Sequence, residues 1–447
     1  MKRQMIKDLT QGNPQKILWQ FALPMFVSVI FQQLYNIADS VIVGNFALHG
    51  EDALAAVGAS YPITMIFMAI ALGCNGGCAV VISQLFGAKR YEEMKTAVST
   101  TLISSLILSA VLTVFGLLFC NLMLAMISTP ENIFSDAAIY LKIYIGGFVF
   151  LFFYNVVTGI FTSLGDSKTP LYFLIGSSLS NIILDYVFVA MLHKDVAGVA
   201  WATFICQGVA CVLAMFTLKN RLSAIVCERK PVIFSAPMLR KIAAYAIPGI
   251  LQQSFISVGN IFVQNLINGF GSSVIAGYSA AIKINTFAIT CFSTLGTAVS
   301  GFTAQNIGAG YTERVKKGLG AGMKMAFAIG AVFFIFCFFK GSMLIELFMK
   351  QRTELAMETG RQFLAIVAPF YFVVSMKLLA DGVLKGSGAM SYFMIATFTD
   401  LILRVILAYI LAIPFGTTGI WLSWPVGWVM GTGLSLIFYG KGVWKKA

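Results

Sequence analysis

The chain has 447 residues, of which 58% are hydrophobic and only 11% are charged, and its mean hydropathy is +0.85. Soluble domains carry about 25% charged residues, so this composition excludes an ordinary water-soluble protein and indicates that most of the chain lies in lipid. The formal net charge of +13 is not that of a nucleic-acid-binding protein, because the Lys and Arg residues stand between apolar runs rather than along one polar face.

The apolar runs are long enough to cross a bilayer as helices, which requires about 20 residues each. Twelve such runs cover residues 17–43, 54–84, 97–120, 135–160, 170–192, 197–218, 242–268, 274–304, 319–340, 360–384, 390–413 and 418–440. The first run is too long, and too interrupted by polar residues, for a cleavable signal peptide, so we expect it to remain as a span. The sequence predicts an all-α membrane protein with twelve transmembrane helices.

The charges of the loops test this number of spans. Basic residues gather in alternate loops, at positions 2–16, 89–95, 168, 219–241, 314–317, 385 and 441–446. The intervening loops are short and poor in basic residues, apart from a mixed loop at 350–358. Because basic loops stay on the cytoplasmic side, we expect both chain termini in the cytoplasm.

The two halves of the chain repeat each other. The segment Gln84-Leu-Phe-Gly87-Ala88 returns 221 residues later as Gln305-Asn-Ile-Gly308-Ala309. Further pairs at the same or a slightly larger offset are Glu92 and Glu313, Gly165 and Gly386, Pro24 and Pro248, and Asn36 and Asn260. We therefore expect an N-terminal lobe (1–218), a basic cytoplasmic linker (219–241) and a C-terminal lobe (242–447) around a central cleft.

Ionisable residues inside the spans are candidates for function, since each is costly to place in a membrane. In the N-terminal half, Asp39 and Asp185 have no basic residue within one helical turn, and Asn181 shares a helix face with Asp185. Such carboxyl groups can carry a proton near neutral pH or, with amide and hydroxyl oxygens around them, hold Na⁺. The alternative is that both acids stay protonated and serve only as structural hydrogen-bond donors.

In the C-terminal half, charges stand four residues apart. Lys377 can pair with Asp381, and Asp400 with Arg404, either as structural ion pairs or as functional groups. Lys283 has no such neighbour and can face the cleft or reach an acid on another helix.

Polar stripes and prolines suggest further roles. The candidate cleft residues are Gln32, Asn36, Asn260, Gln264 and Lys283. Pro24 and Pro248 occupy matching positions early in two spans, where each removes a backbone hydrogen bond, so they are either hinges or plain kinks.

We expect neither enzymatic activity nor a cofactor. The sequence holds no Walker A loop, HExxH or G-x-S-x-G motif. Cys74 and Cys78 of the segment CNGGC are close enough for a metal site, but no His lies nearby, so helix packing is favoured and no metal is expected.

From residue 12 to the last span, the chain resembles the multidrug and toxic compound extrusion (MATE) transporters. The motifs that carry the resemblance are Leu23-Pro24, Asp39-Ser-Val-Ile-Val-Gly44, the duplicated Gln-x-x-Gly-Ala, Leu164-Gly-Asp-Ser-Lys-Thr-Pro170, Asn181-Ile-Ile-Leu-Asp185 and Gly198-Val-Ala-Trp-Ala-Thr203. The resemblance implies two six-helix lobes that rock to export bulky, often cationic organic compounds in exchange for H⁺ or Na⁺.

The resemblance is closest to the prokaryotic DNA-damage-inducible-type branch, in which polar residues of the N-terminal lobe bind the coupling ion. The matching positions here are Asp39, Asn181, Asp185 and Thr203, which Asn155 can join. Another branch has acids on the seventh and tenth spans, but here Gln264 is neutral and Asp381 is out of register, which favours coupling in the N-terminal lobe.

The implied partners are an organic substrate and the bilayer of a prokaryotic plasma membrane, with the chain acting as a monomer. A lipid-linked oligosaccharide flippase of the same superfamily is the alternative, for which Lys283, Lys377 and Arg404 would supply a basic cleft. A passive channel is disfavoured by the repeat and by the intramembrane acids. The sequence leaves open the identity of the substrate, the choice between H⁺ and Na⁺, the stoichiometry, the oligomeric state and the conformation favoured at rest.

Overall fold

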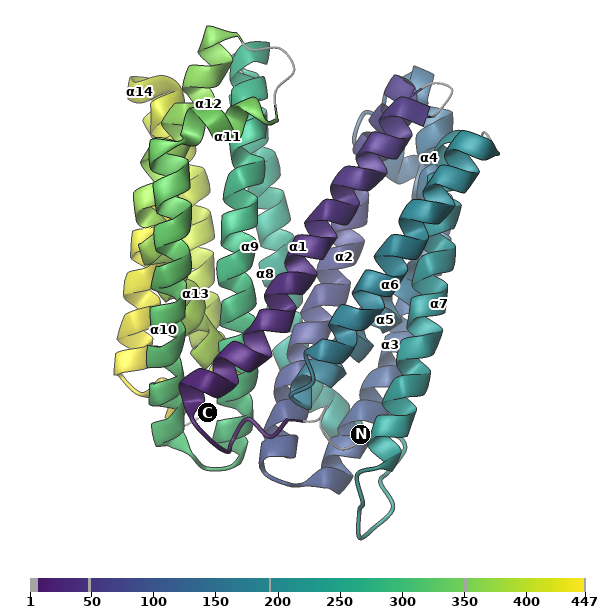
Figure 1. The fold of residues 1–447 in the computed structure, drawn as a ribbon, viewed down its shortest axis with the longest axis vertical. Helices are drawn as coiled ribbons and strands as arrows, with labels where there is room; N and C mark the ends of the chain where they lie inside the picture. The colour runs from purple at the N-terminus through teal and green to yellow at the C-terminus, as the bar shows by residue number, and fades with distance from the viewer. Residues whose placement is uncertain (1–6, 47–49, 193, 349–352, 446–447) are drawn as a thin grey trace. The chain divides into compact units, whose positions relative to one another are not determined.

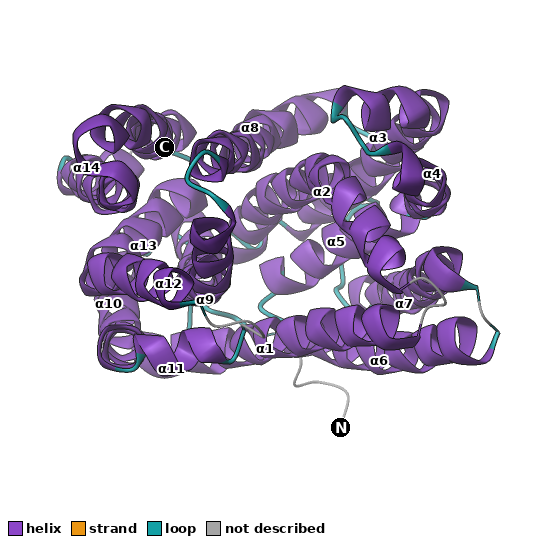
Figure 2. Ribbon diagram, turned by 90° about the horizontal axis from the view of Figure 1, so that it is seen from above, coloured by secondary structure: helices purple, strands orange, loops and turns teal. Residues whose placement is uncertain are grey.

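The computed structural model describes residues 7–46, 50–192, 194–348 and 353–445 (Figure 1). The side chains of residues 39–41 and 43–54 lie outside this description. Every regular element in the described residues is helical, and none of them is a strand (Figure 2). The all-α prediction is therefore confirmed for this part of the chain.

Ten helices of the described chain are long and apolar enough to cross a membrane. A bent pair, which meets at 47° around Gly147, raises the number to eleven if it forms one span. The first-half helices are α1 (Pro14–Phe46), α2 (Gly50–Gly87), α3 (Tyr91–Met126), the bent pair α4 (Glu131–Gly146) and α5 (Phe148–Ser163), α6 (Lys168–Asp185) and α7 (Asp195–Ser223). The second-half helices are α8 (Ala236–Asn268), α9 (Ser272–Gly308), α10 (Thr312–Phe334), α11 (Gly341–Glu346), α12 (Glu354–Val367), α13 (Tyr371–Ser387) and α14 (Met390–Gly440).

Short irregular turns extend several of these helices. A π-helical turn, Tyr186–Met191, follows α6, and a second one, Ile335–Phe339, follows α10. The 3₁₀ turn Ala368–Phe370 joins α12 to α13, and Val443–Lys445 forms another after α14. Since π-helical turns often mark functional sites, the turn directly after Asp185 is of particular interest.

The helix α14 contains two of the predicted spans. Its 51 residues include Gly416, whose φ of 56° and ψ of −136° are not helical. The Cβ position of Gly419 lies against the carbonyl oxygen of Leu411, whereas residues eight apart in a straight helix are about 12 Å apart. The chain therefore turns sharply at Gly416, between the predicted spans 390–413 and 418–440.

The chain packs as two compact units. Unit 1 consists of Met1–Asp8 and Leu23–Gln253, and unit 2 of Leu9–Ala22 and Ser254–Ala447. Two of the three boundaries, at Leu23 and at Ser254, fall inside helices, so the start of α1 packs within unit 2 and the start of α8 packs within unit 1.

In unit 1, α2 and α7 pack closely around α5. The fully buried aromatic side chains of this core include Phe148, Phe152 and Phe161, and Phe67 of α2 meets Phe148 edge to face at 5.0 Å between ring centroids. An aromatic pair in this geometry contributes beyond the burial of its area. The core thereby fixes α2 against α5.

In unit 2, α13 packs along α9 through small residues. A Cβ on Gly382 would overlap the carbonyl oxygen of Gly296, and a Cβ on Gly386 would overlap that of Ser300. Membrane helices approach most closely where side chains are smallest, because dispersion contacts rather than the hydrophobic effect hold them together. The two glycines of α13 therefore allow the backbone contact that forms the centre of unit 2.

The duplicated Gln-x-x-Gly-Ala motif holds chain segments in place. In the second repeat, Gln305 accepts a hydrogen bond from the backbone N–H of Leu9 at 2.9 Å. Arg314 donates to the carbonyl of Gly12 at 2.8 Å and to Asn306 at 2.9 Å. In the first repeat, Gln84 hydrogen-bonds to Tyr245, in the first turns of α8. The second copy of the motif thus contacts the segment before α1, and the first copy contacts α8 itself.

Replacing Gly382 with alanine tests the close contact in unit 2. We expect Gly382→Ala to lower the melting temperature by about 5 °C, because overpacking of this size costs about 1–3 kcal/mol. Thermal unfolding of the detergent-solubilised protein provides the measurement. Gly320→Ala is the control, since a Cβ there meets nothing within 4 Å, and an equal loss in both variants would contradict the packing account.

Candidate functional site

A buried polar group lies at the end of α6 in unit 1. Asp185 is fully buried and Asn181, one turn earlier, is 3% exposed. In the amide orientation that satisfies both of its polar atoms, Asn181 donates to Asp185 Oδ2 at 3.0 Å and to the hydroxyl oxygen of Tyr35 at 3.1 Å. Its amide oxygen accepts from the backbone N–H of Thr203 at 3.2 Å. Asn181 therefore joins residues of α1, α6 and α7, and Figure 2 shows α1 running beside α6.

The arrangement brings together three of the five residues expected at the ion site. Asn181 and Asp185 are in direct contact, and Thr203 joins through its backbone N–H rather than its hydroxyl. The amide of Asn155 donates to the carbonyl of Leu151 in its own helix at 2.9 Å. Asp39 belongs to α1, but its side chain lies outside the described residues.

Tyr35 is the member that the sequence did not predict. It lies on α1 one helical turn before Asp39, within the polar stripe that includes Gln32 and Asn36. The spacing alone places it on the same face as Asp39. Tyrosines inside spans are common, so the sequence alone does not single out Tyr35, and it is the contact with Asn181 that places it in this polar group.

Unit 2 contains a buried cluster of four charged residues. Each member is between 3% and 6% exposed, and the members are Lys377, Asp381, Asp400 and Arg404. Lys377 Nζ lies 2.8 Å from Asp381 Oδ2 and 3.6 Å from Asp400 Oδ2. Ser435 donates to Asp381 Oδ1 at 2.5 Å. Lys377 therefore balances two acids at once, one on its own helix and one on α14.

Arg404 makes a different contact from the one expected. Among the described residues, Arg404 forms no salt bridge with Asp400, which is four residues earlier on the same helix. Instead, the guanidinium carbon of Arg404 lies 4.3 Å from the ring centroid of Trp424. Asp400 Oδ1 and Arg404 Nε have no hydrogen-bond partner among the described atoms. A guanidinium over an indole face is stabilised electrostatically, so Arg404 is held by an aromatic ring as well as by the nearby carboxylate.

The candidate cleft and hinge residues lie on several helices. Gln32, Asn36, Asn260 and Lys283 are exposed. Gln264 is partly buried and donates to Asn268 at 2.9 Å. Both Pro24 and Pro248 are buried, and α1 and α8 continue through them. The assignment of these residues to a cleft or a hinge stays a prediction.

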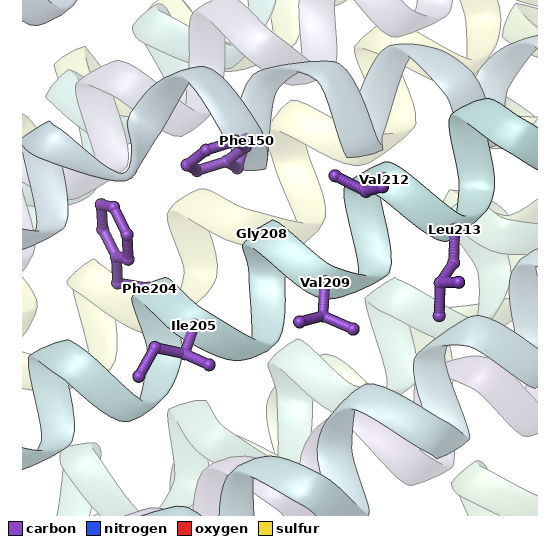
Figure 3. Close-up of a pocket in the computed structure, with 7 residues that line it drawn as sticks. All are labelled: Phe150, Phe204, Ile205, Gly208, Val209, Val212 and Leu213. Atoms are coloured by element: carbon purple, nitrogen blue, oxygen red, sulfur yellow. The ribbon is translucent and has the colours of Figure 1, made fainter.

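A groove on the outside of α5 and α7 is entirely apolar. It encloses about 360 Å³ and is lined by Phe150, Phe204, Ile205, Gly208, Val209, Val212 and Leu213 (Figure 3). Phe150 and Phe204 meet edge to face at 5.6 Å between ring centroids. Specific ligand sites add a few polar groups that fix the ligand's orientation, and the lining of this groove supplies none.

The described residues contain no cluster of three or more His, Cys, Asp or Glu side chains that could hold a metal ion. In the CNGGC segment, the Cys78 thiol donates to the carbonyl of Asn75. This contact is within the helix and satisfies the thiol locally.

Comparison with known proteins identifies the family. The profile of the MatE family matches residues 24–187 and, a second time, residues 248–410. The chain belongs to the MatE family. The double match coincides with the internal repeat, and the resemblance to the MATE transporters is confirmed.

Relatives of this MatE protein match it along nearly its whole length. It is 28% identical over 447 residues to the "Probable multidrug resistance protein YpnP" of Bacillus subtilis (strain 168), which covers 98% of this chain and 97% of the relative. A solved structure described as the outward-facing conformation of a multidrug resistance MATE family transporter has 23% identity, covers 100% of both chains and superposes with a TM-score of 0.90. The protein is a multi-pass membrane protein with the fold of these transporters, and its relatives place it in the bacterial plasma membrane.

The expected branch of the family has weaker support. DNA damage-inducible protein F of Escherichia coli (strain K12) is 23% identical over 211 residues, which cover 46% of this chain. YpnP matches a longer part of the chain at higher identity. Membership of the family is secure, whereas the comparisons favour the YpnP-like relatives over the DNA-damage-inducible branch.

Removing the central lysine of the unit 2 cluster should destabilise the protein. Lys377→Met leaves two buried acids without their cation, which costs about 3–5 kcal/mol when a buried pair is broken. We expect a clearly lower melting temperature, partly restored by adding Asp400→Asn. Lys283→Met, at an exposed position of α9, is the control and should change stability by less than about 0.5 kcal/mol. Equal melting temperatures for the two single variants would contradict a stabilising role of the cluster.

Proposed function

We propose that the protein is a secondary active antiporter that exports organic, mainly cationic and amphipathic compounds in exchange for H⁺ or Na⁺. Membership of the MatE family and the name of the relative YpnP, a probable multidrug resistance protein, support export of drugs. The proposal includes twelve spans in two lobes, both termini in the cytoplasm, and alternating access. The sharp turn at Gly416 supports counting α14 as two spans.

The observation that carries the proposal is the buried carboxyl of Asp185 within the Asn181 hydrogen bonds. A fully buried carboxyl in a membrane protein is costly as an anion and gains strongly from binding a cation or a proton. Asn181 fixes Asp185 and Tyr35 relative to each other. Asp39, one turn beyond Tyr35 on α1, is proposed as the second acid of the site.

In the described part of unit 2, the buried acids Asp381 and Asp400 lie beside a fixed cation, which supports placing the coupling ion in unit 1. The acids Asp381 and Asp400 both lie within 4 Å of the ammonium group of Lys377. A bound Na⁺ there would be repelled by Lys377 and by Arg404 nearby. The cluster is therefore proposed to hold α13 against α14 rather than to bind the coupling ion.

Ion and substrate are coupled through their affinities for two conformations. A ligand shifts a conformational equilibrium only as far as its affinities for the two states differ. We propose that the ion at Asp185 joins α1 to α6 and stabilises one state, while the organic substrate stabilises the other. Pro24 on α1 is the proposed point at which the helix yields.

Neutralising Asp185 tests the assignment. In proteoliposomes, Asp185→Asn should reduce gradient-driven efflux of a fluorescent organic cation by about tenfold or more, because the ion can no longer bias the two states. Efflux under separate pH and Na⁺ gradients identifies the ion. Glu313→Gln, which removes an exposed acid paired with Lys316, should retain full transport.

Asp39→Asn belongs in the same experiment. Full gradient-driven export by both aspartate variants, each reconstituted to the wild-type level, would make the two acids structural and overturn the proposed coupling site.

Removing the hydroxyl of Tyr35 should have a smaller effect. Tyr35→Phe deletes one acceptor of Asn181, and a single hydrogen bond contributes about 0.5–1.5 kcal/mol. We expect the half-saturating concentration of the coupling ion to rise by about twofold to tenfold, with the maximal rate nearly unchanged. An unchanged half-saturating concentration would exclude Tyr35 from the site.

The lipid-linked oligosaccharide flippase is the less favoured alternative. Two of its three proposed basic residues, Lys377 and Arg404, are buried against acids and an indole ring in unit 2. Only Lys283 is exposed. Binding of a polyprenyl pyrophosphate, combined with no gradient-dependent export of organic cations, would favour the flippase.

A further inference from the structure

The segment that connects α7 to α8, residues 224–235, is fastened along α3. The fastening residues of α3 are Glu92, Lys95, Thr96, Ser99 and Thr100, whose spacing places them on one helix face. They bond the backbone of the segment at the N–H of Arg229 (2.6 Å), the carbonyl of Ile225 (2.7 Å), the N–H of Val232 (3.1 Å), the carbonyl of Val232 (3.3 Å) and the N–H of Ser235 (3.1 Å). The connecting segment is therefore an ordered strap.

Fastening the backbone to α3 leaves apolar side chains on the outer face of the strap. Val226 is 85% exposed, Val232 60%, Ile233 74% and Phe234 43%. Burying a valine or isoleucine side chain is worth about 1.5–3 kcal/mol. Apolar exposure of this extent, outside the candidate spans, indicates that something covers these side chains.

Basic residues accompany the apolar ones. Arg229 and Lys230 are exposed between Val226 and Val232, and Arg240 and Lys241 are exposed in the first turns of α8. Glu228 is the one acidic residue in positions 224–241. The covering partner must therefore offer both hydrocarbon and negative charge.

The position of the strap identifies that partner. The strap joins the end of one candidate span, Ser223, to the start of the next, Ala236. In Figure 1 it forms the loop below the lower end of α7. Only 17% of the apolar window of α3 is buried within the protein, the lowest share among the candidate spans in the described chain. The outer surface of α3 therefore faces lipid, and the strap beside its first turns lies where the acyl chains meet the headgroups.

We propose that residues 224–235 form a membrane-interface anchor that binds anionic phospholipids. Val232 and Ile233 insert between acyl chains, while Arg229 and Lys230 contact phosphate-bearing headgroups. Amphipathic segments with this division of apolar and basic residues bind in the interface plane, and each basic residue adds attraction to an anionic surface. A soluble protein would have to bring both an acidic and an apolar surface, whereas a bilayer beside the poorly buried helix α3 offers hydrocarbon and headgroup charge together, so lipid is the better fit.

Quenching by brominated lipids tests the anchor in the intact protein. The variant Ile233→Trp is reconstituted into nanodiscs that contain brominated phosphatidylglycerol or brominated phosphatidylcholine, and the emission of the wild type is subtracted. We expect the added indole to be quenched by both lipids and more strongly by phosphatidylglycerol. Quenching by aqueous iodide but by neither lipid would overturn the anchor, and equal quenching by both lipids would overturn the selection of anionic headgroups.

A charge-removing double variant provides an independent measurement. Arg229→Gln with Lys230→Gln should weaken the preference for phosphatidylglycerol over phosphatidylcholine by about tenfold or more, since two attractions to the anionic surface are lost. Lys316→Gln with Lys317→Gln, at two exposed positions near the start of α10, is the matched control and should retain the preference. An unchanged preference in the Arg229 and Lys230 double variant would contradict the headgroup contact.

Discussion

Hydrocarbon offers no hydrogen bonds, so a chain that lies in it must satisfy its own polar groups, and this constraint shapes every part of the molecule. Helices satisfy the backbone. The few buried charges and amides then have to find each other across helices: Asn181 links α1, α6 and α7, and Lys377 links α13 and α14. These buried polar contacts therefore help to hold α1, α6 and α7 together in one place, and α13 and α14 in another.

The two units bury their ionisable side chains in different ways. In unit 2, two cations and two acids are buried together, with Lys377 between the acids and Arg404 over the Trp424 ring. In unit 1, the described site holds Asp185 together with the amide of Asn181, which also contacts the hydroxyl of Tyr35. A fully buried carboxyl gains strongly from binding a proton or a metal cation, which is the physical basis for proposing ion coupling in unit 1.

The sequence predicted those features that depend on local spacing. Apolar runs predicted the helices because a span is long and uniformly apolar, and four-residue spacing predicted the contact of Asn181 with Asp185. Contacts between helices were not predictable in this way. The pairing of Asp400 with Lys377 instead of Arg404, and the role of Tyr35, depend on how separate helices approach. The bend at Gly147 was also missed, since two glycines within an apolar run are compatible with a straight span.

The exchange of helix starts between the units has a consequence for biosynthesis. Unit 1 is incomplete until Gln253 has been made, and unit 2 includes Leu9–Ala22, which emerge from the ribosome long before the remainder. The segment Leu9–Ala22 therefore lacks its final contacts until Gln305 and Arg314, which hydrogen-bond to Leu9 and Gly12, have been synthesised. The two homologous halves cannot mature one after the other as independent bundles. Each unit is complete only when segments from both halves of the chain have been synthesised.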